Sequence, residues 1–292
     1  MKKYIDRYVN FFSHKNEKIL LQNNCIYRLY NNMVIPFGPA SVNYSIHKKE
    51  AKKIRKSFKA HIIRTTSGFP NNISNGWYAV ICSKFTPIEE LKSKYRNEVK
   101  KGLNNCIVKK IDIEFLANNG FEIYNSALKK YKNKPNTIDK ENFRLNTLKN
   151  IDFSDIFHIW GVFYNEKLIG YSEVYIFDKI EANYSVVKIN PEYLHLYSSY
   201  ALFYTMNKYY LDECKFQYVN DGFCSISHDT NIQNLLIKKF GFEKKYTKLF
   251  VNYSGLLFII INLLLPFYKI VNKINPKVGA LLKLEKIRRN QK

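Results

Sequence analysis

Three side chains of this 292-residue chain have the chemistry that proton transfer requires. Asp221 and His228 flank a loop after an expected strand at residues 216–221, and open α/β sheets place ligands at the carboxyl ends of strands. His228 is the candidate general base because the pKa of an imidazole lies near physiological pH. Glu173 falls inside an expected strand at residues 168–177, where an acid should face a substrate site or a cation.

Each of these three residues also has a structural explanation. Asp221 precedes a glycine, so its carboxylate can form an Asx turn with Gly222. His228 can pack ahead of the helix that follows it, and Glu173 can lie on the solvent face of its strand. The sequence leaves both interpretations open for all three.

Two cations form a second group of candidates. Arg96 and Lys100 lie one turn apart in a helix that should begin after Thr86 and end at residue 101, where Gly102 follows. Their side chains could hold a phosphate of a lipid-linked sugar or of tRNA. The alternative is a solvated basic face. The five cysteines form no CxxC pair, and no His or Cys spacing predicts a metal site.

The segments that must position these side chains alternate between strand and helix patterns. The first part of the chain predicts a hairpin, a basic helix and several strands, at residues 25–30 with 33–36, 47–58, 61–65, 76–82 and 106–111. Further helices are expected at residues 113–132, interrupted near Gly120, and at 141–149.

The second part of the chain predicts a more regular succession of elements. Apolar alternation indicates an antiparallel meander, with strands at residues 156–164, 168–177 and 182–189. A buried helix at 198–213 and the strand at 216–221 follow. Thr230 and Gln233 form a capping box at the start of the next helix, and Gly241 is its expected C-cap. A last strand is expected at 244–252.

The succession of elements from residue 156 to 252 resembles the core of a GNAT acyltransferase. Two upstream segments, IPFGP at 35–39 and LKSKYRNEVKKGLNNCIVKKI at 91–111, are similar to the first half of FemAB-like proteins, which carry two GNAT-like subdomains in tandem. The resemblance implies an α/β (α+β) fold with a mixed, mainly antiparallel sheet flanked by helices. It implies a first, truncated half at 1–110, a second half with the active site at 111–252, and a tail at 253–292.

The resemblance also implies where an acyl donor binds. The donor should lie between two splayed strands, with its phosphates over the turn that opens the buried helix. Here the first strand is 184–189 and the turn is 194–199, so the donor-binding candidates are Val187, Ile189, His195, Tyr197, Ser198 and Ser199. The turn LHLYSS lacks the glycines that let backbone approach a pyrophosphate. Acyl-CoA and aminoacyl-tRNA are both candidate donors, because family members that build peptide bridges use the latter.

Charge and the C-terminal segment predict an anionic partner. The formal net charge is +23, which favours nucleic acid, phosphate-bearing substrates or acidic lipid. Residues 256–265 are apolar except for Asn262, and a basic stretch follows Pro266. Because about 20 apolar residues are needed to cross a bilayer, we expect this segment to embed in the anionic cytoplasmic leaflet rather than to span. A helix packed on the protein's own core is the alternative.

The N-terminal residues lack an apolar run of signal-peptide length, so we expect a cytoplasmic protein, peripheral on the inner membrane face. Two functions remain. The first is transfer of an acyl or aminoacyl group to a cell-envelope or polysaccharide precursor, such as a lipid-linked amino sugar. The second is a non-catalytic protein of the same fold that binds anionic membrane or nucleic acid.

Overall fold

The computed structural model of the protein describes residues 3–129, 137–226 and 231–291. Within these ranges the chain forms two compact units. Unit 1 contains residues 1–80, 223–234 and 244–292, and unit 2 contains residues 81–222 and 235–243. The chain therefore passes between the two units several times after residue 222. The limits of the units differ from the boundaries expected at residues 110 and 252.

Unit 1 is built on a five-stranded sheet with the strand order β1-β2-β3-β4-β12. Its first strands form the predicted hairpin, and β12 returns from the end of the chain to pair with β4. The elements before residue 80 are α1 (Lys3–His14), β1 (Ile19–Gln22), β2 (Cys25–Tyr30), β3 (Met33–Phe37), α2 (Lys48–Ser57), β4 (Ile62–Thr66) and most of β5 (Trp77–Cys82). Those after residue 243 are β11 (Glu243–Thr247), β12 (Leu249–Tyr253), α9 (Gly255–Leu264), η5 (Leu265–Phe267), α10 (Tyr268–Ile274) and α11 (Pro276–Asn290).

Unit 2 contains the predicted meander, within a sheet of strand order β11-β5-β10-β9-β8-β7-β6. Its first elements are η1 (Ile88–Glu90), α3 (Ser93–Asn105), β6 (Ile107–Ile111), α4 (Ile113–Asn119), α5 (Phe121–Leu128), α6 (Lys140–Leu148) and η2 (Ile151–Phe153). The remainder are β7 (Phe157–Tyr164), β8 (Lys167–Phe177), β9 (Glu181–Ile189), η3 (Pro191–Leu196), α7 (Ser198–Asn207), η4 (Lys208–Glu213), β10 (Tyr218–Phe223) and α8 (Asn231–Lys239).

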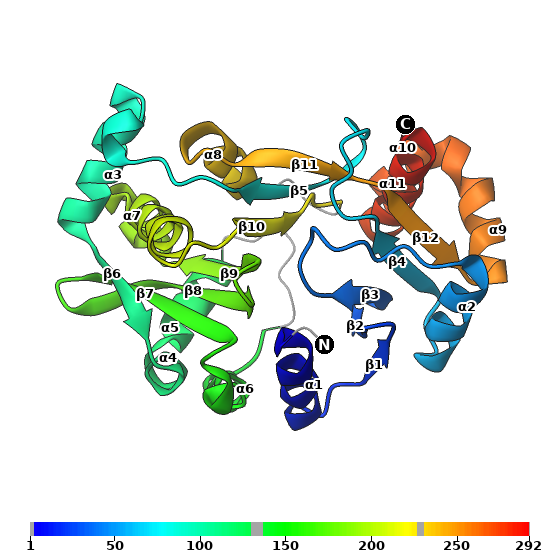
Figure 1. Cartoon of the computed structure of the whole chain (residues 1–292), viewed down its shortest axis with the longest axis horizontal. Helices are drawn as coiled ribbons and strands as arrows, with labels where there is room; N and C mark the ends of the chain where they lie inside the picture. Colours follow the sequence, from blue (N-terminus) through cyan, green and yellow to red (C-terminus); the bar gives the residue numbers. More distant parts are fainter. Residues whose placement is uncertain (1–2, 130–136, 227–230, 292) are drawn as a thin grey trace. The chain divides into compact units, whose positions relative to one another are not determined.

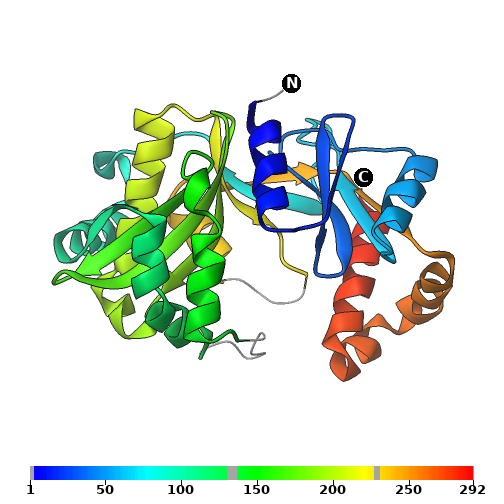
Figure 2. The same cartoon turned by 90° about the horizontal axis from the view of Figure 1, so that it is seen from below.

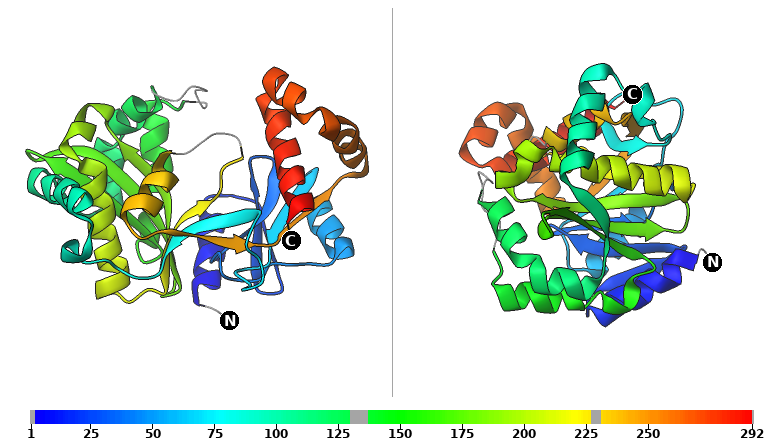
Figure 3. Two further views of the ribbon diagram at one scale, coloured as in Figure 1. Left: turned by 90° about the horizontal axis from the view of Figure 1, so that it is seen from above. Right: turned by 90° about the vertical axis from the view of Figure 1, so that its left-hand side faces the viewer.

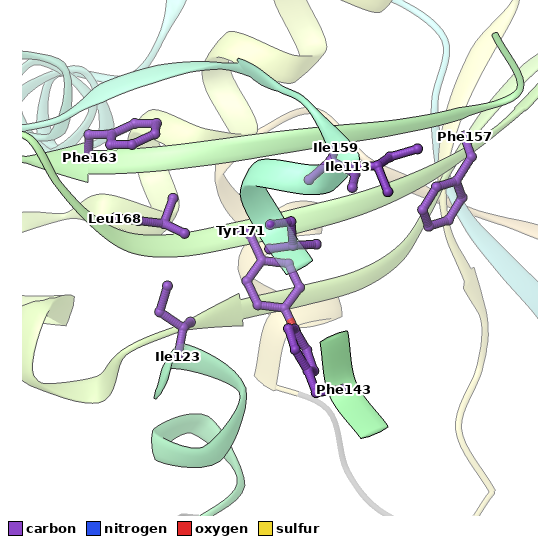
Figure 4. Close-up of a cluster of buried hydrophobic side chains, with 9 residues drawn as sticks. Ile113, Ile123, Phe143, Phe157, Ile159, Phe163, Leu168 and Tyr171 are labelled. Carbon is purple, nitrogen blue, oxygen red and sulfur yellow. The ribbon is translucent and has the colours of Figure 1, made fainter. Parts of the chain in front are cut away.

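The two faces of the meander are covered by different helices. Helix α7 lies on one face, and α4 and α5 lie on the other (Figure 1). Seen from below, α4, α5 and α6 stand in front of the strands (Figure 2). The core beneath them contains Ile113 and Leu116 of α4, Phe143 of α6, and Ile159 and Tyr171 of the sheet (Figure 4). Alternate residues along each strand point to opposite faces, so odd-numbered positions of β7, and of β8 from Tyr171 onward, face these helices. Before the register shift in β8, the even-numbered Leu168 faces them instead.

The opposite face of the sheet is held to η4 by a buried tyrosine. The Tyr210 hydroxyl accepts a hydrogen bond from Trp160 Nε1 at 2.9 Å and lies 2.9 Å from His158 Nδ1. Both of these partners are even-numbered residues of β7. The sequence predicts one helix over 198–213, but its last turns, Lys208–Glu213, are a π-helix. The π-helical turns contain Tyr209 and Tyr210, and the rings of both contact Trp160.

The expected end of a helix at Gly102 is wrong. The segment begins with the short η1, and α3 then continues through Gly102 to Asn105. Gly102 is buried because α3 packs against the start of α7, where a side chain would not fit. A glycine inside a helix costs only about 1 kcal/mol relative to alanine, so close packing can retain it.

The C-terminal segment forms a longer helix than the apolar run at 256–265 suggests. Residues Gly255–Ile274 form one helical segment of 20 residues, long and apolar enough to cross a membrane by length and composition. Pro266 lies in its middle, where a 3-10 turn connects α9 to α10. After Asn275, α11 turns back, and the three helices lie together (Figure 3). Buried residues of this group include Ile261 of α9 and Leu282 of α11.

Candidate functional site

The parallel strands β9 and β10 pair over a short distance and then separate. Their register joins Tyr218 to Glu181, Val219 to Ala182 and Asn220 to Asn183. Beyond Asn183, β9 continues to Ile189 with β8 as its partner. The sequence places the donor-binding strand at 184–189, and this is the part of β9 that follows the last pair with β10.

A β-bulge lies in β9 directly after this separation. Glu173 of β8 pairs with Val186, and Val174 pairs with Tyr184, so Ser185 is the extra residue. A bulge disrupts the regular ladder of hydrogen bonds and re-aims the neighbouring side chains. Ser185 is exposed. Of the two donor-binding candidates on β9, Val187 pairs with Ser172 and Ile189 with Gly170, and both are half-buried.

Glu173 lies beside the bulge on the face covered by α4 to α6. Its partners in the adjacent strands are Ile159 and Val186, and Ile159 belongs to the core of that face. The Glu173 side chain is half-buried. It is therefore neither fully solvated nor enclosed in the core, and it lies beside the point where the strands separate.

Asp221 follows the last paired residue of β10 and points to the other face. Asn220 pairs with Asn183, which pairs with Tyr175 of the α4 to α6 face, so the adjacent Asp221 faces α7. The charge of Asp221 contributes to raising the pKa of Tyr184 on that face, after burial as the main cause. Glu173 and Asp221 thus lie near one separation of strands but on opposite faces of the sheet. His228, with Asp229 and Thr230, lies outside the described residues.

The turn after β10 is closed by a different side chain from the one expected. Asn220 Oδ1 accepts a hydrogen bond from the backbone N–H of Gly222 at 2.8 Å, and Gly222 has a φ of +87°. Asn220 therefore forms an Asx turn with Gly222, the structural role that the sequence analysis offered for Asp221.

A buried carboxylate that the sequence reasoning missed stands at the paired end of these strands. Glu181 is 1% exposed and accepts hydrogen bonds from Tyr218 Oη at 2.7 Å, Asn220 Nδ2 at 2.9 Å and Asn183 Nδ2 at 2.8 Å. The four residues connect the first residues of β9 and β10 on one face of the sheet. Polar residues at alternate positions, Glu181 with Asn183 and Tyr218 with Asn220, are the sequence signal that could have revealed them.

The predicted donor turn lies between η3 and α7. Tyr197 has a φ of +58° and precedes the first residue of α7. The first amides of a helix lack intrahelical partners, and the helix dipole favours anions there. Ser198 is buried, and its hydroxyl donates to the Tyr193 carbonyl at 3.0 Å, whereas Ser199 is half-buried. His195 is exposed, and its Nδ1 lies 2.7 Å from the Glu192 carbonyl.

The glycine that permits close backbone approach at this turn comes from a distant part of the sequence. A Cβ atom on Gly102 of α3 would lie 2.6 Å from the Tyr197 carbonyl oxygen. Asn105 Nδ2 donates to the Leu196 carbonyl at 3.4 Å, and Lys101 Nζ lies 5.8 Å from the centre of the Tyr197 ring. Helix α3 is therefore a wall of the donor turn, which no local motif could indicate.

The cations predicted to bind an anionic substrate differ in their surroundings. Arg96 is half-buried and donates through Nη2 to the Leu91 carbonyl at 3.2 Å, whereas Lys100 is exposed. Lys239 of α8 was not predicted, yet it contacts the beginning of α7. Its ammonium lies 2.8 Å from Glu98 and hydrogen-bonds Tyr200. Burial opposes the charged form, but the bonds to Glu98 and Tyr200 outweigh it and raise the pKa of Lys239.

No group of three or more His, Cys, Asp or Glu side chains that could hold a metal ion occurs within residues 3–129, 137–226 and 231–291. The buried thiols at Cys82 and Cys106 have a raised pKa because burial disfavours the thiolate. Covalent catalysis through either sulfur is therefore disfavoured.

Comparison with solved structures identifies the architecture. The C-terminal domain of a protein from Agrobacterium fabrum, described as a lysylphosphatidylglycerol synthetase, matches at a TM-score of 0.54 and 8% identity, covering 89% of this chain and 95% of that chain. FemX matches at a TM-score of 0.54 and 11% identity, covering 91% and 93%. A tandem GNAT protein from the clavulanic acid biosynthesis pathway matches at a TM-score of 0.47 and 10% identity, covering 79% and 78%. No protein-family model and no curated protein matches the chain.

The likeness to FemX extends over nearly the whole of both chains, and it confirms the predicted FemAB-like fold. The mixed sheets flanked by helices confirm the predicted fold class as well. At these sequence identities the likeness concerns the fold, so the roles of individual side chains rest on their geometry.

Proposed function

We propose that unit 2 transfers an acyl group from an anionic donor to an amine or hydroxyl acceptor. The observation that carries this proposal is the separation of β9 from β10 directly after three parallel pairs, with a bulge at Ser185 and the N-terminus of α7 following β9. An extended donor arm can take the place of the missing strand pairing. Its phosphates would then lie against the first amides of α7.

Acyl transfer needs a proton acceptor and a partner for the developing oxyanion. The acceptor nitrogen or oxygen attacks the acyl carbonyl carbon and loses its proton, and the leaving group gains one. Glu173 is our candidate for the base because it is half-buried beside the bulge. Backbone N–H groups freed at the bulge are suited to the oxyanion. Asp221 and His228 remain candidates for the proton that the leaving group needs.

Two classes of molecule compete as the acyl donor. The donor turn has no glycine, and Tyr197 occupies the position where backbone would approach a pyrophosphate. This favours a large polyanion, aminoacyl-tRNA, whose binding would draw on the net charge of +23. Acyl-CoA is the competing donor, and its arm would enter along Val187 and Ile189.

For the acceptor we propose a cell-envelope or polysaccharide precursor that carries an amine, including a lipid-linked sugar. One structural neighbour is described as a lysylphosphatidylglycerol synthetase, a name that combines an aminoacyl group with a lipid. The exposed ammonium of Lys100 would attract a phosphate of such an acceptor.

The donor can be identified by thermal unfolding of the full chain with coenzyme A or with aminoacyl-tRNA. A ligand that binds only the folded state raises its stability, by about 2.7 kcal/mol at a concentration 100 times its Kd. We expect aminoacyl-tRNA to raise the Tm and deacylated tRNA to do so less. If neither donor changes the Tm, the proposed transferase is wrong.

The base can be tested in the transfer reaction once a donor is known. Glu173→Gln should lower kcat by about 10²- to 10⁴-fold, the usual contribution of a general base. Glu166→Gln, in the exposed turn between β7 and β8, is the matched control and should leave kcat unchanged. Equal rates for the two variants would remove Glu173 from the mechanism.

The second candidate function is a non-catalytic protein of the same fold that binds anionic membrane or nucleic acid. The donor turn favours it, because Tyr197 stands where a glycine would let backbone approach a pyrophosphate, and the Ser198 hydroxyl already donates to the Tyr193 carbonyl. Binding of deacylated and aminoacylated tRNA with equal affinity, without transfer, would support this alternative.

A further inference from the structure

We propose that unit 1 docks on an anionic lipid bilayer through an apolar stripe along α9, η5 and α10. The stripe consists of Leu256, Ile259, Leu263, Phe267, Ile270 and Ile274, whose exposed fractions range from 57% to 79%. Their spacing of three, four or seven residues places them on one side of the helical segment. Exposed apolar surface of this continuity is unusual on a monomeric protein and marks an interaction site.

The opposite side of the same helix is attached to the unit 1 sheet. Ile261 is 2% exposed and packs in a cluster with Ile62 of β4, Tyr253 of β12 and Leu282 of α11. Lipid could surround the helix on all sides only if this cluster came apart. The helix is therefore suited to lie in the plane of the interface, with the stripe in the acyl region and the cluster intact.

The charges beside the stripe select an anionic surface. Residues Phe267 and Ile270 of the stripe line a hollow of about 500 Å³ together with Lys269, Lys286 and Arg289. These three cations are exposed. Their ammonium and guanidinium groups lie beside apolar side chains, as a headgroup phosphate above acyl chains requires.

The only acid in residues 253–292, Glu285, pairs with Arg288 and Arg289 and offsets part of their charge. Glu285 is fully buried and accepts hydrogen bonds from Arg288 and Arg289, at 2.8 Å and 2.7 Å to their Nε atoms. Arg289 also donates to Asn262 of α9, which joins α11 to the helix that carries the stripe. Buried Glu285 and its two arginine partners therefore fix the position of the basic residues relative to the stripe.

This docking surface lies in unit 1 and does not depend on the acyl transfer proposed for unit 2. A failure of one proposal leaves the other intact, because flotation measures lipid binding without any donor. A free phosphate or a nucleic acid would use the cations but not the stripe, so apolar substitutions separate a bilayer from those ligands.

The test of the stripe is flotation of the full chain with vesicles of phosphatidylcholine alone or mixed equally with phosphatidylglycerol. We expect binding to the mixed vesicles, and we expect Leu263→Asp and Ile270→Asp each to weaken it at least about tenfold, since each removes the burial of one large apolar side chain. Leu145→Asp on α6 is the matched control, because Leu145 is also exposed, at 47%. Equal flotation of the stripe variants and the control would overturn the proposal.

The test of the charges uses the double variant Lys269→Gln/Lys286→Gln. Each lysine near an anionic surface contributes about 1 kcal/mol, or about fivefold in affinity, so the pair should weaken binding about 25-fold. Lys140→Gln/Lys149→Gln, at the first residue of α6 and at the residue after its end, changes the net charge equally and should have little effect. Equal loss for the two double variants would mean that net charge alone acts, and it would contradict the proposed surface.

The orientation of the helix is tested by extraction of the bound protein with alkaline carbonate. An interfacial helix should be released, whereas a spanning helix should stay in the membrane pellet. Because every substituted side chain is exposed, far-UV circular dichroism should be unchanged in the variants. Retention of the wild type after carbonate would overturn the interfacial orientation.

Discussion

Acidification should destabilise unit 2 through the half-buried histidine His158. Burial, followed by the nearby positive charge of Lys110, lowers the pKa of His158 from 6.5 to about 4. In the unfolded chain the imidazole should titrate near its ordinary value of about 6.5. Between these two pKa values the unfolded state therefore binds a proton that the folded state does not bind. Stability from the neutral imidazole is complete above pH 6.5 and is lost as the pH falls toward 4.

The size of the effect follows from the difference between these pKa values. One pKa unit corresponds to about 1.36 kcal/mol, so the full difference between 6.5 and about 4 amounts to about 3 kcal/mol. At about pH 4.5 most of it, about 2.5 kcal/mol, is already lost, since the unfolded imidazole is then almost fully protonated. A loss of this size is a large part of the stability of a typical domain.

The assay is urea unfolding at neutral pH and near pH 4.5, followed by tryptophan fluorescence. Trp160 reports on this region because Trp160 and His158 share Tyr210 as a partner. In His158→Gln the amide can still contact Tyr210 but does not titrate, so about 2 to 3 kcal/mol of the acid loss should disappear. His195→Gln, at an exposed site, is the control. An acid loss in His158→Gln as large as in the wild type would refute the reasoning.

Substitutions at three further positions have expected outcomes that urea unfolding can measure. Gly102→Ala should cost about 1 to 3 kcal/mol, because its Cβ would lie 2.6 Å from the Tyr197 carbonyl oxygen, and unchanged stability would mean that α3 can move away from the donor turn. Glu181→Leu should cost about 2 to 5 kcal/mol by leaving three buried donors without an acceptor, and Glu181→Gln should cost less; the reverse order would contradict the hydrogen-bond network. Burial opposes ionisation of Glu285, but its two arginine partners outweigh burial and lower its pKa. Its stabilisation is therefore present above the unfolded pKa of about 4.3 and lost as the pH falls below it, so Glu285→Gln should reduce stability at neutral pH and flatten the acid side of the stability profile.

The local elements of unit 2 were predictable because their signals lie within a few residues. The meander β7 to β9 appears where apolar alternation and turn residues indicate it, and the break near Gly120 separates α4 from α5. The helix after β10 ends before Gly241, which has a φ of +71°. Each of these follows from periodicity or from a conformation that glycine adopts most easily.

The candidate site was only partly predictable, because pairing between distant strands decides which side chains meet. The sequence identified the separating part of β9 and the turn before α7. It did not indicate that Glu173 and Asp221 point to opposite faces, since this depends on the register of β8, β9 and β10. Nor did it indicate the buried Glu181, whose partners Tyr218 and Asn220 lie 37 and 39 residues away.

The C-terminal segment illustrates the same division. Its apolar run and its cations were evident from the sequence, which predicted an anionic surface as their partner. Helical packing on β4, β12 and α11 then decided that one side is buried and the other is free.

The sequence by itself thus determined the order of strands and helices, the strong positive charge and the resemblance to FemAB-like proteins, because propensity, periodicity and charge are properties of short segments. Only the tertiary structure decided that Gly102 of α3 closes on the donor turn and that a carboxylate is buried between β9 and β10. It also decided that a stripe of α9 and α10 remains exposed. Such contacts join residues far apart in the chain, and their geometry depends on strand register and helix packing rather than on neighbouring residues.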